Sequence, residues 1–478
     1  MIATKQYYLD TFGVKEQDLE GLVAEALRGG GDFCDLFFES TSYRDILLRD
    51  GEVSSGGFHI DYGVGIRVLD GDRTGYAYSE STDIASMRIA AASAAAISAG
   101  RGPQEIRTSD HRHFGRPNPA ADRYPMADDW RTADIKAQVP MLEGLEADIR
   151  ARDQRVVKVI AMLSAQVSDI LMFNSFGELK YDTRPMGSIA VSVIFAQEGK
   201  TETKSVSRSF RAGCEMLSPS LLKEMAEEAV EGVDERFAAR RPKGGRMSVV
   251  MGAGASGILL HEAMGHSFEA DFNRKGQSIF ADKMGQRICP SGITIVDDGT
   301  IRGNRGAVNF DDEGVGGQRT AMVEDGVLTS YLHDRISAKH YCVAPTGNGR
   351  RESFRYNPIP RMRATYMESG TATKDSLIAE VKSGVYVDQF SNGQVKIGEG
   401  DFTFYVKSGF LIEDGRLTMP IKDINIIGNG PQALADIVGV ADDLKIADST
   451  WTCGKEQNVP VSCGMPSVLV NNLTVGGE

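Results

Sequence analysis

The sequence predicts an α+β protein, with an N-terminal α/β region built on antiparallel sheets and a β-rich C-terminal domain. Strand-like runs of β-branched residues recur along the chain. Asp-Gly pairs, which supply the positive φ angles of tight hairpin turns, separate several of these runs. With 478 residues, the chain is also too long for one ordinary core and suits two or three domains.

The first hundred residues begin with a predicted amphipathic helix over residues 15–28. The glycines at 29–31 end it, because a glycine run does not continue a helix. The Ala-rich segment 84–99 predicts a buried or half-buried helix rather than a membrane span, since Ser, Met and Arg88 interrupt it. Strand-like runs cover residues 33–39, 42–49, 57–69 and 74–79, with turn signals at Asp50-Gly51 and Asp70-Gly71.

The next part of the chain opens with a proline-rich segment over residues 100–129, which predicts a long surface connection. Predicted helices at 133–151 and 218–239 then flank strand-like runs at 156–163, 165–174 and 187–196. The charged, proline- and glycine-containing stretch 240–245 predicts a domain boundary. We therefore expect an N-terminal α/β domain (1–100), a central α/β region (101–240) and a β-rich C-terminal domain (246–478).

The C-terminal domain consists mostly of predicted short strands separated by turns. Two predicted helices, at residues 255–272 and 375–382, are the exceptions. Three further Asp-Gly pairs predict hairpins, at Asp298-Gly299, Asp325-Gly326 and Asp414-Gly415.

The composition excludes several classes of function. Lys plus Arg number 53 and Asp plus Glu number 66, so the formal charge is −13, which disfavours nucleic acid as a partner. No apolar run is long enough for a signal sequence or a membrane span, so we expect a cytoplasmic protein without membrane contact. The sequence contains six cysteines, Cys34, Cys214, Cys289, Cys342, Cys453 and Cys463. They form no CxxC pair and indicate no disulfide framework.

The segment that opens the C-terminal domain fits a dinucleotide-binding motif. Gly252, Gly254 and Gly257 match G-x-G-x-x-G between a predicted strand and a predicted helix. That motif also needs a second strand ending in an acidic residue about 20 positions further on. Asp271 and the residues after it contain no such strand, which weighs against a dinucleotide-dependent oxidoreductase.

The same segment fits a metal site better. His261, Glu262 and His266 form H-E-x-x-x-H, one residue longer than the motif of helical zinc proteases. On a regular α-helix, residues i and i+5 lie about 140° apart, so the two imidazoles would diverge. A wide π-type turn returns them to one face, and Gly265 is the residue expected to tolerate it. The spacing therefore predicts a bulged or broken helix at the ligands.

Catalytic zinc uses three protein ligands and keeps one position open for water. Spacing leaves the third ligand open, because several side chains are candidates: Glu269, Asp271, His333, His340 or a distant cysteine. If the metal is zinc, its bound water ionises near neutral pH. Glu262 is then placed to take the proton and pass it to the leaving amine, which is hydrolysis of an amide bond.

Over essentially its whole length, the chain resembles the TldD/PmbA family of metallopeptidases, and specifically the TldD branch. The motifs that carry the resemblance are residues 30–36, 62–67, 261–271, 349–353 with 360–362, 398–402, and Cys453-Gly454-Lys455 with 459–461 and 473–477. The resemblance implies zinc held by His261, His266 and Cys453, with Glu262 as general base. The chain departs from the family pattern at Glu456-Gln457-Asn458, one residue shorter than expected, which puts the loop beside Cys453 in question.

The resemblance also implies substrates and partners. It predicts hydrolysis of unfolded peptides or peptide precursors by a homodimer, or by a heterodimer with a PmbA/TldE-type paralogue. Arg350 and Arg351 are candidates for contacts with the peptide backbone, because arginine is frequent at interfaces. The alternative from another class is a non-catalytic peptide-binding subunit, which would have no reason to keep both histidines, Glu262 and Cys453.

Overall fold

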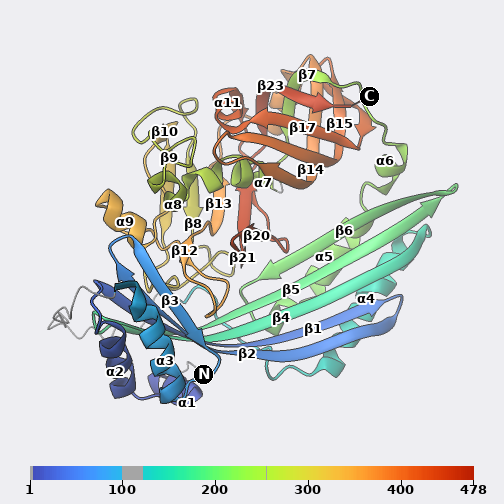
Figure 1. Cartoon of the computed structure of the whole chain (residues 1–478). Helices are drawn as coiled ribbons and strands as arrows, with labels where there is room; N and C mark the ends of the chain where they lie inside the picture. Colours follow the sequence, from blue (N-terminus) through green and yellow to red (C-terminus); the bar gives the residue numbers. More distant parts are fainter. Residues whose placement is uncertain (1–3, 99–121, 255, 478) are drawn as a thin grey trace.

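The computed structural model describes residues 4–98, 122–254 and 256–477, so most of the predicted connection at 100–129 lies outside the described residues. Within them, one long antiparallel sheet in the order β3-β2-β1-β4-β5-β6 forms the N-terminal half (Figure 1). The expected boundary near residue 100 does not divide this sheet, because β1 pairs with β4. Its strands are β1 (Phe33–Arg49), β2 (Glu52–Asp70), β3 (Arg73–Ser79), β4 (Val156–Asn174), β5 (Leu179–Gln197) and β6 (Lys200–Phe210).

Two pairs of predicted strands are in fact single strands. Runs 33–39 and 42–49 form the continuous β1, and runs 156–163 and 165–174 form the continuous β4. The intervening Ser40 and Ser164 stay within the ladder because their backbones pair with Tyr62 and Asp45. The sequence patterns also missed β6, which begins directly after the turn at Glu198-Gly199.

Helices cover one face of this sheet and form two cores with it (Figure 1). They are α1 (Lys5–Phe12), α2 (Glu16–Ala26), α3 (Ile84–Ala95), α4 (Ile135–Arg152), α5 (Pro219–Val230) and α6 (Val233–Ala238). The first three pack on the half of the sheet that includes Leu36 and Ile66, and α4 and α5 pack on the half that includes Leu163 and Val191. The predicted helix over 218–239 breaks at Gly232, where φ is 68°.

The C-terminal domain contains a closed ring of strands. The ring runs β14-β7-β23-β17-β15 and closes through a β14–β15 pairing, while β16 and β18 add to its margin. Its pairs are mostly antiparallel, although β7 and β14 run parallel. The strands are β7 (Gly245–Met251), β14 (Ser383–Val395), β15 (Asp401–Glu413), β16 (Arg416–Ile421), β17 (Ile424–Asn429), β18 (Ile437–Val440) and β23 (Val468–Gly476).

A second C-terminal sheet lies beside the ring in the order β10-β9-β8-β13-β22-β19, and two small two-stranded sheets accompany it (Figure 1). The predicted α+β class is confirmed. These strands are β8 (Ile295–Asp298), β9 (Arg319–Glu324), β10 (Val327–Leu328), β13 (Ala364–Met367), β19 (Lys445–Ile446) and β22 (Ser462–Met465), with the small pairs β11 (Gly349–Arg350)–β12 (Ile359–Pro360) and β20 (Thr452–Lys455)–β21 (Gln457–Pro460).

The C-terminal helices are short. They are α7 (Gly257–Leu260), α8 (Ala270–Arg274), α9 (Arg335–Tyr341), α10 (Lys374–Ala379) and α11 (Gly430–Ala435). The predicted helix at 375–382 is α10, one residue earlier at its start and shorter at its end, and the sequence patterns missed α9 and α11. Among the described residues, no helix combines the length and apolar character that crossing a membrane requires.

Four of the five Asp-Gly pairs form tight turns between adjacent antiparallel strands, as predicted. Asp50, Asp325 and Asp414 adopt positive φ angles there, and Gly71 does so between β2 and β3. At Asp298-Gly299 the predicted tight turn is absent, although the flanking strands β8 and β9 do pair with each other. The Asp298 carboxylate accepts a hydrogen bond from the Thr300 N–H, and the chain leaves the sheet over residues 299–318 before it returns as β9.

Candidate metal centre

The helix that carries the two histidines changes its winding at the first of them. α7 ends at Leu260, a π turn covers His261–Gly265, and a 3₁₀ turn follows at His266–Phe268. The N–H of His266 donates to the carbonyl of His261, five residues back. The predicted wide turn is therefore confirmed, and it places both imidazoles on one side of the segment.

Gly265 is needed for a different reason from the one predicted. Its φ and ψ angles, −56° and −47°, are those of an ordinary helix, so no special backbone freedom is used. A Cβ atom at this position would instead lie 2.1 Å from Sδ of Met362. The glycine therefore lets the π turn lie close against Met362, just before β13.

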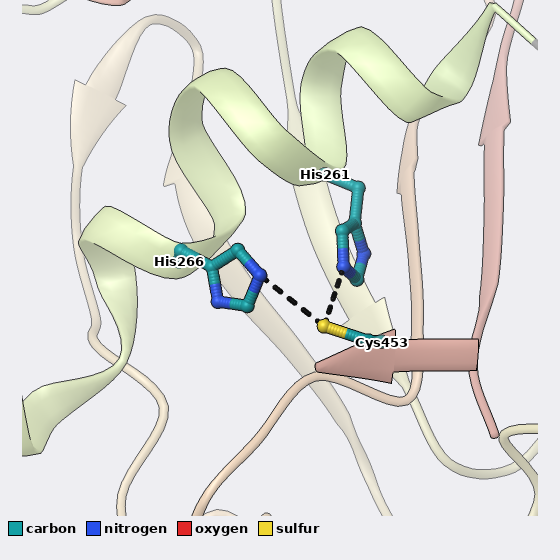
Figure 2. Close-up of side chains that lie close together, drawn as sticks. All are labelled: His261, His266 and Cys453. Carbon is teal, nitrogen blue, oxygen red and sulfur yellow. Dashed lines mark hydrogen bonds between the residues drawn. The ribbon is translucent and has the colours of Figure 1, made fainter. Parts of the chain in front are cut away.

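Three donor atoms meet below this turn (Figure 2). Sγ of Cys453, on β20, lies 3.1 Å from Nε2 of His261 and 3.2 Å from Nε2 of His266. The three side chains are 0–4% exposed, and their donor atoms all lie within 4.8 Å of one another. Two donors around a tetrahedral zinc lie about 3.5 Å apart, given metal–ligand distances of about 2.0–2.3 Å. Two imidazoles and a thiolate are also ligands that zinc prefers, so these residues fit the ion.

The electrostatics of the cluster favour a thiolate. Burial raises the pKa of Cys453, but the neighbouring His261 and His266 lower it to about 4. Burial lowers the pKa of His266, whereas the Glu269 carboxylate and Cys453 raise it to about 10. The cysteine is thus held in the form that binds metal ions, and the histidine must release its proton when an ion binds.

Glu269 orients one of the ligands. Its Oε2 accepts a hydrogen bond from Nδ1 of His266 at 3.0 Å, which leaves Nε2 of that ring facing Cys453. Nζ of Lys455 lies 2.9 Å from the same Glu269 oxygen and 2.8 Å from Oδ1 of Asp271. The sequence patterns left Glu269 and Asp271 open as third ligands, and the structure places both around Lys455 instead.

Arg361 holds the strand that carries the third donor. Its guanidinium, fully buried, donates to the carbonyls of Cys453 and Gln457 at 2.8 Å each, and its Nε lies 3.5 Å from Oε1 of Glu269. One charged network therefore connects the histidine segment with the β20–β21 hairpin. The sequence marked the motif that contains Arg361 but gave no sign of this role, because the contacts join residues 92 or more positions apart.

The shortened stretch after Cys453 forms a tight hairpin. Lys455 pairs with Gln457 across the turn residue Glu456, whose φ angle is 56°. The side chain of Gln457 accepts a hydrogen bond from the Glu352 N–H at 2.6 Å, and the Glu352 carboxylate accepts one from the Asn458 N–H at 2.6 Å. The segment around Glu352 thus fixes the loop beside Cys453.

Glu262 lies at the edge of the cluster. Its side chain is 20% exposed, and its Oε2 is 3.9 Å from Nε2 of His266. It is therefore close to the donor atoms and open to solvent at the same time. His333, another candidate ligand, is not part of the cluster: it lies buried among Tyr331 and Tyr341, and burial lowers its pKa to about 4.

Comparison with known proteins identifies the family. Models of the three domains of the PmbA/TldA metallopeptidases match residues 34–98, 128–236 and 244–477. The chain belongs to this TldD/PmbA family. It is 38% identical over 452 residues to a metalloprotease TldD homolog of Haemophilus influenzae, covering 93% of each chain. It is 33% identical over 238 residues to a zinc metalloprotease TldD homolog of Saccharolobus solfataricus, covering 49% of this chain and 53% of that one.

Solved structures share the fold of this family member. A Thermotoga maritima protein described as a putative modulator of a DNA gyrase superposes with a TM-score of 0.75 at 21% identity, covering 96% of this chain and 99% of that one. TldE from Thermococcus kodakarensis superposes with a TM-score of 0.73 at 19% identity, covering 96% and 100%. Both extend the fold assignment over nearly the whole chain.

The two candidate substrate-binding arginines contact the chain itself. Arg350 donates to the carbonyls of Met362 and Pro460 at 2.6 and 2.7 Å. Arg351 donates to the carbonyl of Asp312 at 2.9 Å and lies 4.1 Å from the ring centre of Phe37. Both guanidinium groups are buried. Their binding of substrate stays a prediction, and the contacts seen here hold parts of the fold together.

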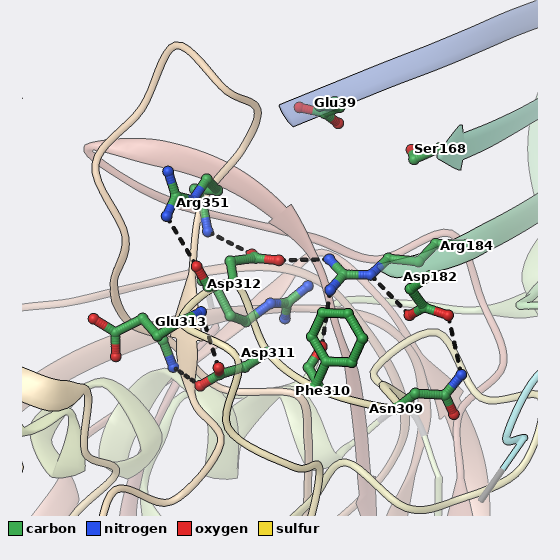
Figure 3. Close-up of polar contacts among 12 residues, drawn as sticks. Glu39, Ser168, Asp182, Arg184, Asn309, Phe310, Asp311, Asp312, Glu313 and Arg351 are labelled. Atoms are coloured by element: carbon green, nitrogen blue, oxygen red, sulfur yellow. Dashed lines mark hydrogen bonds and ion pairs between the residues drawn. The ribbon is translucent and has the colours of Figure 1, made fainter. Parts of the chain in front are cut away.

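Arg351 belongs to a buried polar interface between the N-terminal sheet and the C-terminal segment 309–313 (Figure 3). Arg184 of β5 pairs with Asp312 and donates to the carbonyl of Phe310 at 2.8 Å. Arg67 of β2 pairs with Glu313 at 2.6 Å. These ion pairs fix the sheet relative to the domain that contains the metal centre.

The dinucleotide alternative is wrong. The N–H groups of Gly252 and Gly254 donate to the carbonyls of Val387 and Met465, both at 2.8 Å, so they do not face a ligand. A Cβ atom at Gly257 would lie 2.6 Å from N of Gly464. Gly257 serves close packing of α7 on β22, Gly252 lies against Tyr386 of β14, and β7 belongs to a closed ring rather than to a parallel doubly wound sheet.

Proposed function

We propose that the chain is a zinc-dependent peptidase that hydrolyses peptide bonds of unfolded peptides or peptide precursors. The observation that carries the proposal is the convergence of His261, His266 and Cys453 beside the partly exposed Glu262. Membership of a metallopeptidase family and the zinc metalloprotease name of a relative support it.

His261, His266 and Cys453 are the proposed ligands of the ion. Bound there, zinc supplies Lewis-acid polarisation of the scissile carbonyl and lowers the pKa of a water molecule. The Glu262 carboxylate accepts the proton of the attacking water and delivers it to the leaving amine nitrogen. Glu269 keeps the proton of His266 on Nδ1, so that Nε2 keeps its lone pair for the ion.

An extended peptide substrate is proposed to bind along the small sheet that carries Cys453. β20 and β21 form a two-stranded sheet, and main-chain hydrogen bonds to the margin of such a sheet hold a peptide without regard to its sequence. We further propose a dimer, formed with a second copy or with a TldE-type paralogue, since a TldE shares the fold. Light scattering of the chain alone and with the paralogue distinguishes the two forms.

The test is Glu262→Gln, assayed by mass spectrometry of an unfolded protein digest and by metal analysis. We expect about one zinc per chain in both forms. We expect kcat to fall about 10²- to 10⁴-fold in the variant, the range of a lost general base. The exposed Glu380→Gln serves as the matched control. Undiminished cleavage by Glu262→Gln with zinc retained would rule out the assigned role, and absence of cleavage by the unaltered chain would favour the peptide-binding subunit.

A further inference from the structure

The segment between β11 and β12, residues 351–357, lies against the face of the N-terminal sheet opposite the helices. Successive residues of a strand face opposite sides of its sheet. In β2, Ile66 packs with the helices, so Gly63 and Gly65 face the other side. A Cβ atom at either glycine would meet Phe354 of this segment. The two glycines therefore form a socket for Phe354.

The N–H, the carbonyl and the ring of Phe354 are all held by the N-terminal sheet. The N–H donates to Oε2 of Glu39, on β1, at 2.7 Å, and the carbonyl accepts a hydrogen bond from the hydroxyl of Tyr76, on β3, at 2.6 Å. The ring is fully buried in a cluster that also contains Phe37 and Met172. The position of this residue is therefore set by the sheet.

The residues on either side of Phe354 bind the hairpin that carries Cys453. The Glu352 N–H donates to Oε1 of Gln457 at 2.6 Å, and Nε2 of Gln457 donates to the carbonyl of Asn357 at 2.9 Å. Gln457 is only 5% exposed, so one buried amide joins both ends of the segment to β21. β21 in turn pairs with β20, which contains the cysteine.

The metal centre requires this hairpin to be placed accurately. The groups of a functional site must be held within about 0.5 Å of their productive positions. The two histidines belong to a buried helical segment, whereas Sγ of Cys453 comes from a two-stranded sheet. A sheet of two strands is only marginally stable by itself, so its position depends on the contacts around it. Arg361 supplies such contacts from the C-terminal domain, and Gln457 links the hairpin to the N-terminal sheet.

We propose that Phe354 and Gln457 are positioning residues for the third metal ligand, and that the N-terminal sheet completes the metal centre through them. The inference rests on the proposed function, because it takes Cys453 as a zinc ligand. Both residues act through the backbone of the β20–β21 hairpin. The motifs at 62–67 and 349–353 thereby share one role, since the first provides the socket and the second leads into the segment that fills it.

The experiment compares metal binding by the full chain and by its variants. Zinc affinity is measured by competition with a chelator, and cobalt(II) binding by the thiolate-to-cobalt charge-transfer band. Gln457→Leu should weaken zinc binding about 10- to 100-fold and reduce that band. Tyr76→Phe, which frees the carbonyl of Phe354, should weaken zinc binding about three- to tenfold. Tyr8→Phe is the matched control, because its hydroxyl bonds Thr183 in the core on the opposite face, and it should bind both metals like the unaltered chain.

Unchanged zinc affinity and an unchanged cobalt band in folded Gln457→Leu would overturn the inference. An equal loss of affinity in Tyr8→Phe would also overturn it, because the effect would then reflect general destabilisation. Tyr76 is half-buried and loses only a hydroxyl, so its variant keeps the test decisive if Gln457→Leu fails to fold. Failure of the proposed function is a separate result: an unaltered chain that binds neither metal would overturn the zinc site and this inference together.

Discussion

Charged side chains gather both at the metal centre and in a cleft lined by β6, α5, α6, β14 and β15, but the cleft contains cations that are not paired directly. Around the metal centre, Glu269 faces Lys455, Arg361 and His266, so the carboxylate and its cations compensate one another. In the cleft, Arg236 and Lys407 form no side-chain hydrogen bond or ion pair among the described residues, although Glu202 and Asp388 lie near Arg236 and Glu228 lies near Lys407. Direct pairing holds the side chains of the metal centre in place, whereas Arg236 and Lys407 depend on carboxylates that form no ion pair with them.

The largest expected effect comes from breaking the compensated network. Arg361→Met leaves Glu269 without one partner and frees the carbonyls of Cys453 and Gln457. We expect a loss of about 3–5 kcal/mol in the free energy of unfolding, measured by denaturant titration. Zinc affinity, measured by competition with a chelator, should fall about 10- to 100-fold. The exposed Arg241→Met is the control, and unchanged zinc affinity in Arg361→Met would contradict the positioning role.

A smaller effect tests whether shape, rather than charge, controls the same site. Gly265→Ala places a methyl group against Met362 and should cost about 1–3 kcal/mol of unfolding free energy. Shortening the neighbour in Gly265→Ala/Met362→Val should recover part of this loss, which a double-mutant cycle measures. Additive losses in the cycle would show that the two residues do not meet as described.

The smallest effect has the opposite sign. Lys407→Met removes a half-buried cation whose ammonium forms no hydrogen bond or ion pair among the described residues, and it keeps most of the packing volume. We expect the free energy of unfolding to rise by up to about 1 kcal/mol in thermal or denaturant unfolding without added ligand. Lys445→Met, on the exposed margin, should stay within about 0.5 kcal/mol. A lower free energy of unfolding in Lys407→Met would instead show that neighbouring carboxylates compensate the charge of this lysine.

Local patterns predicted the features that depend on neighbouring residues. The spacing of His261 and His266 required a wide turn, because two ligands five residues apart do not share a face of an α-helix. The same patterns split β1 and β4 into shorter runs, since short polar interruptions on a half-buried sheet resemble strand ends. The prediction at Asp298 failed in another way: β8 and β9 do pair, but residues 299–318 connect them, and an Asp-Gly pair does not fix the length of a connection.

The sequence by itself determined the fold class, the histidine motif and the helix distortion that it requires. Spacing could not select Cys453, because 187 residues separate it from His266, and only the family resemblance pointed to it. Tertiary structure alone decided the roles of Arg361 and Lys455 and the gathering of Lys204, Arg236 and Lys407. Those arrangements depend on how distant strands pack, and local propensities carry no information about such contacts.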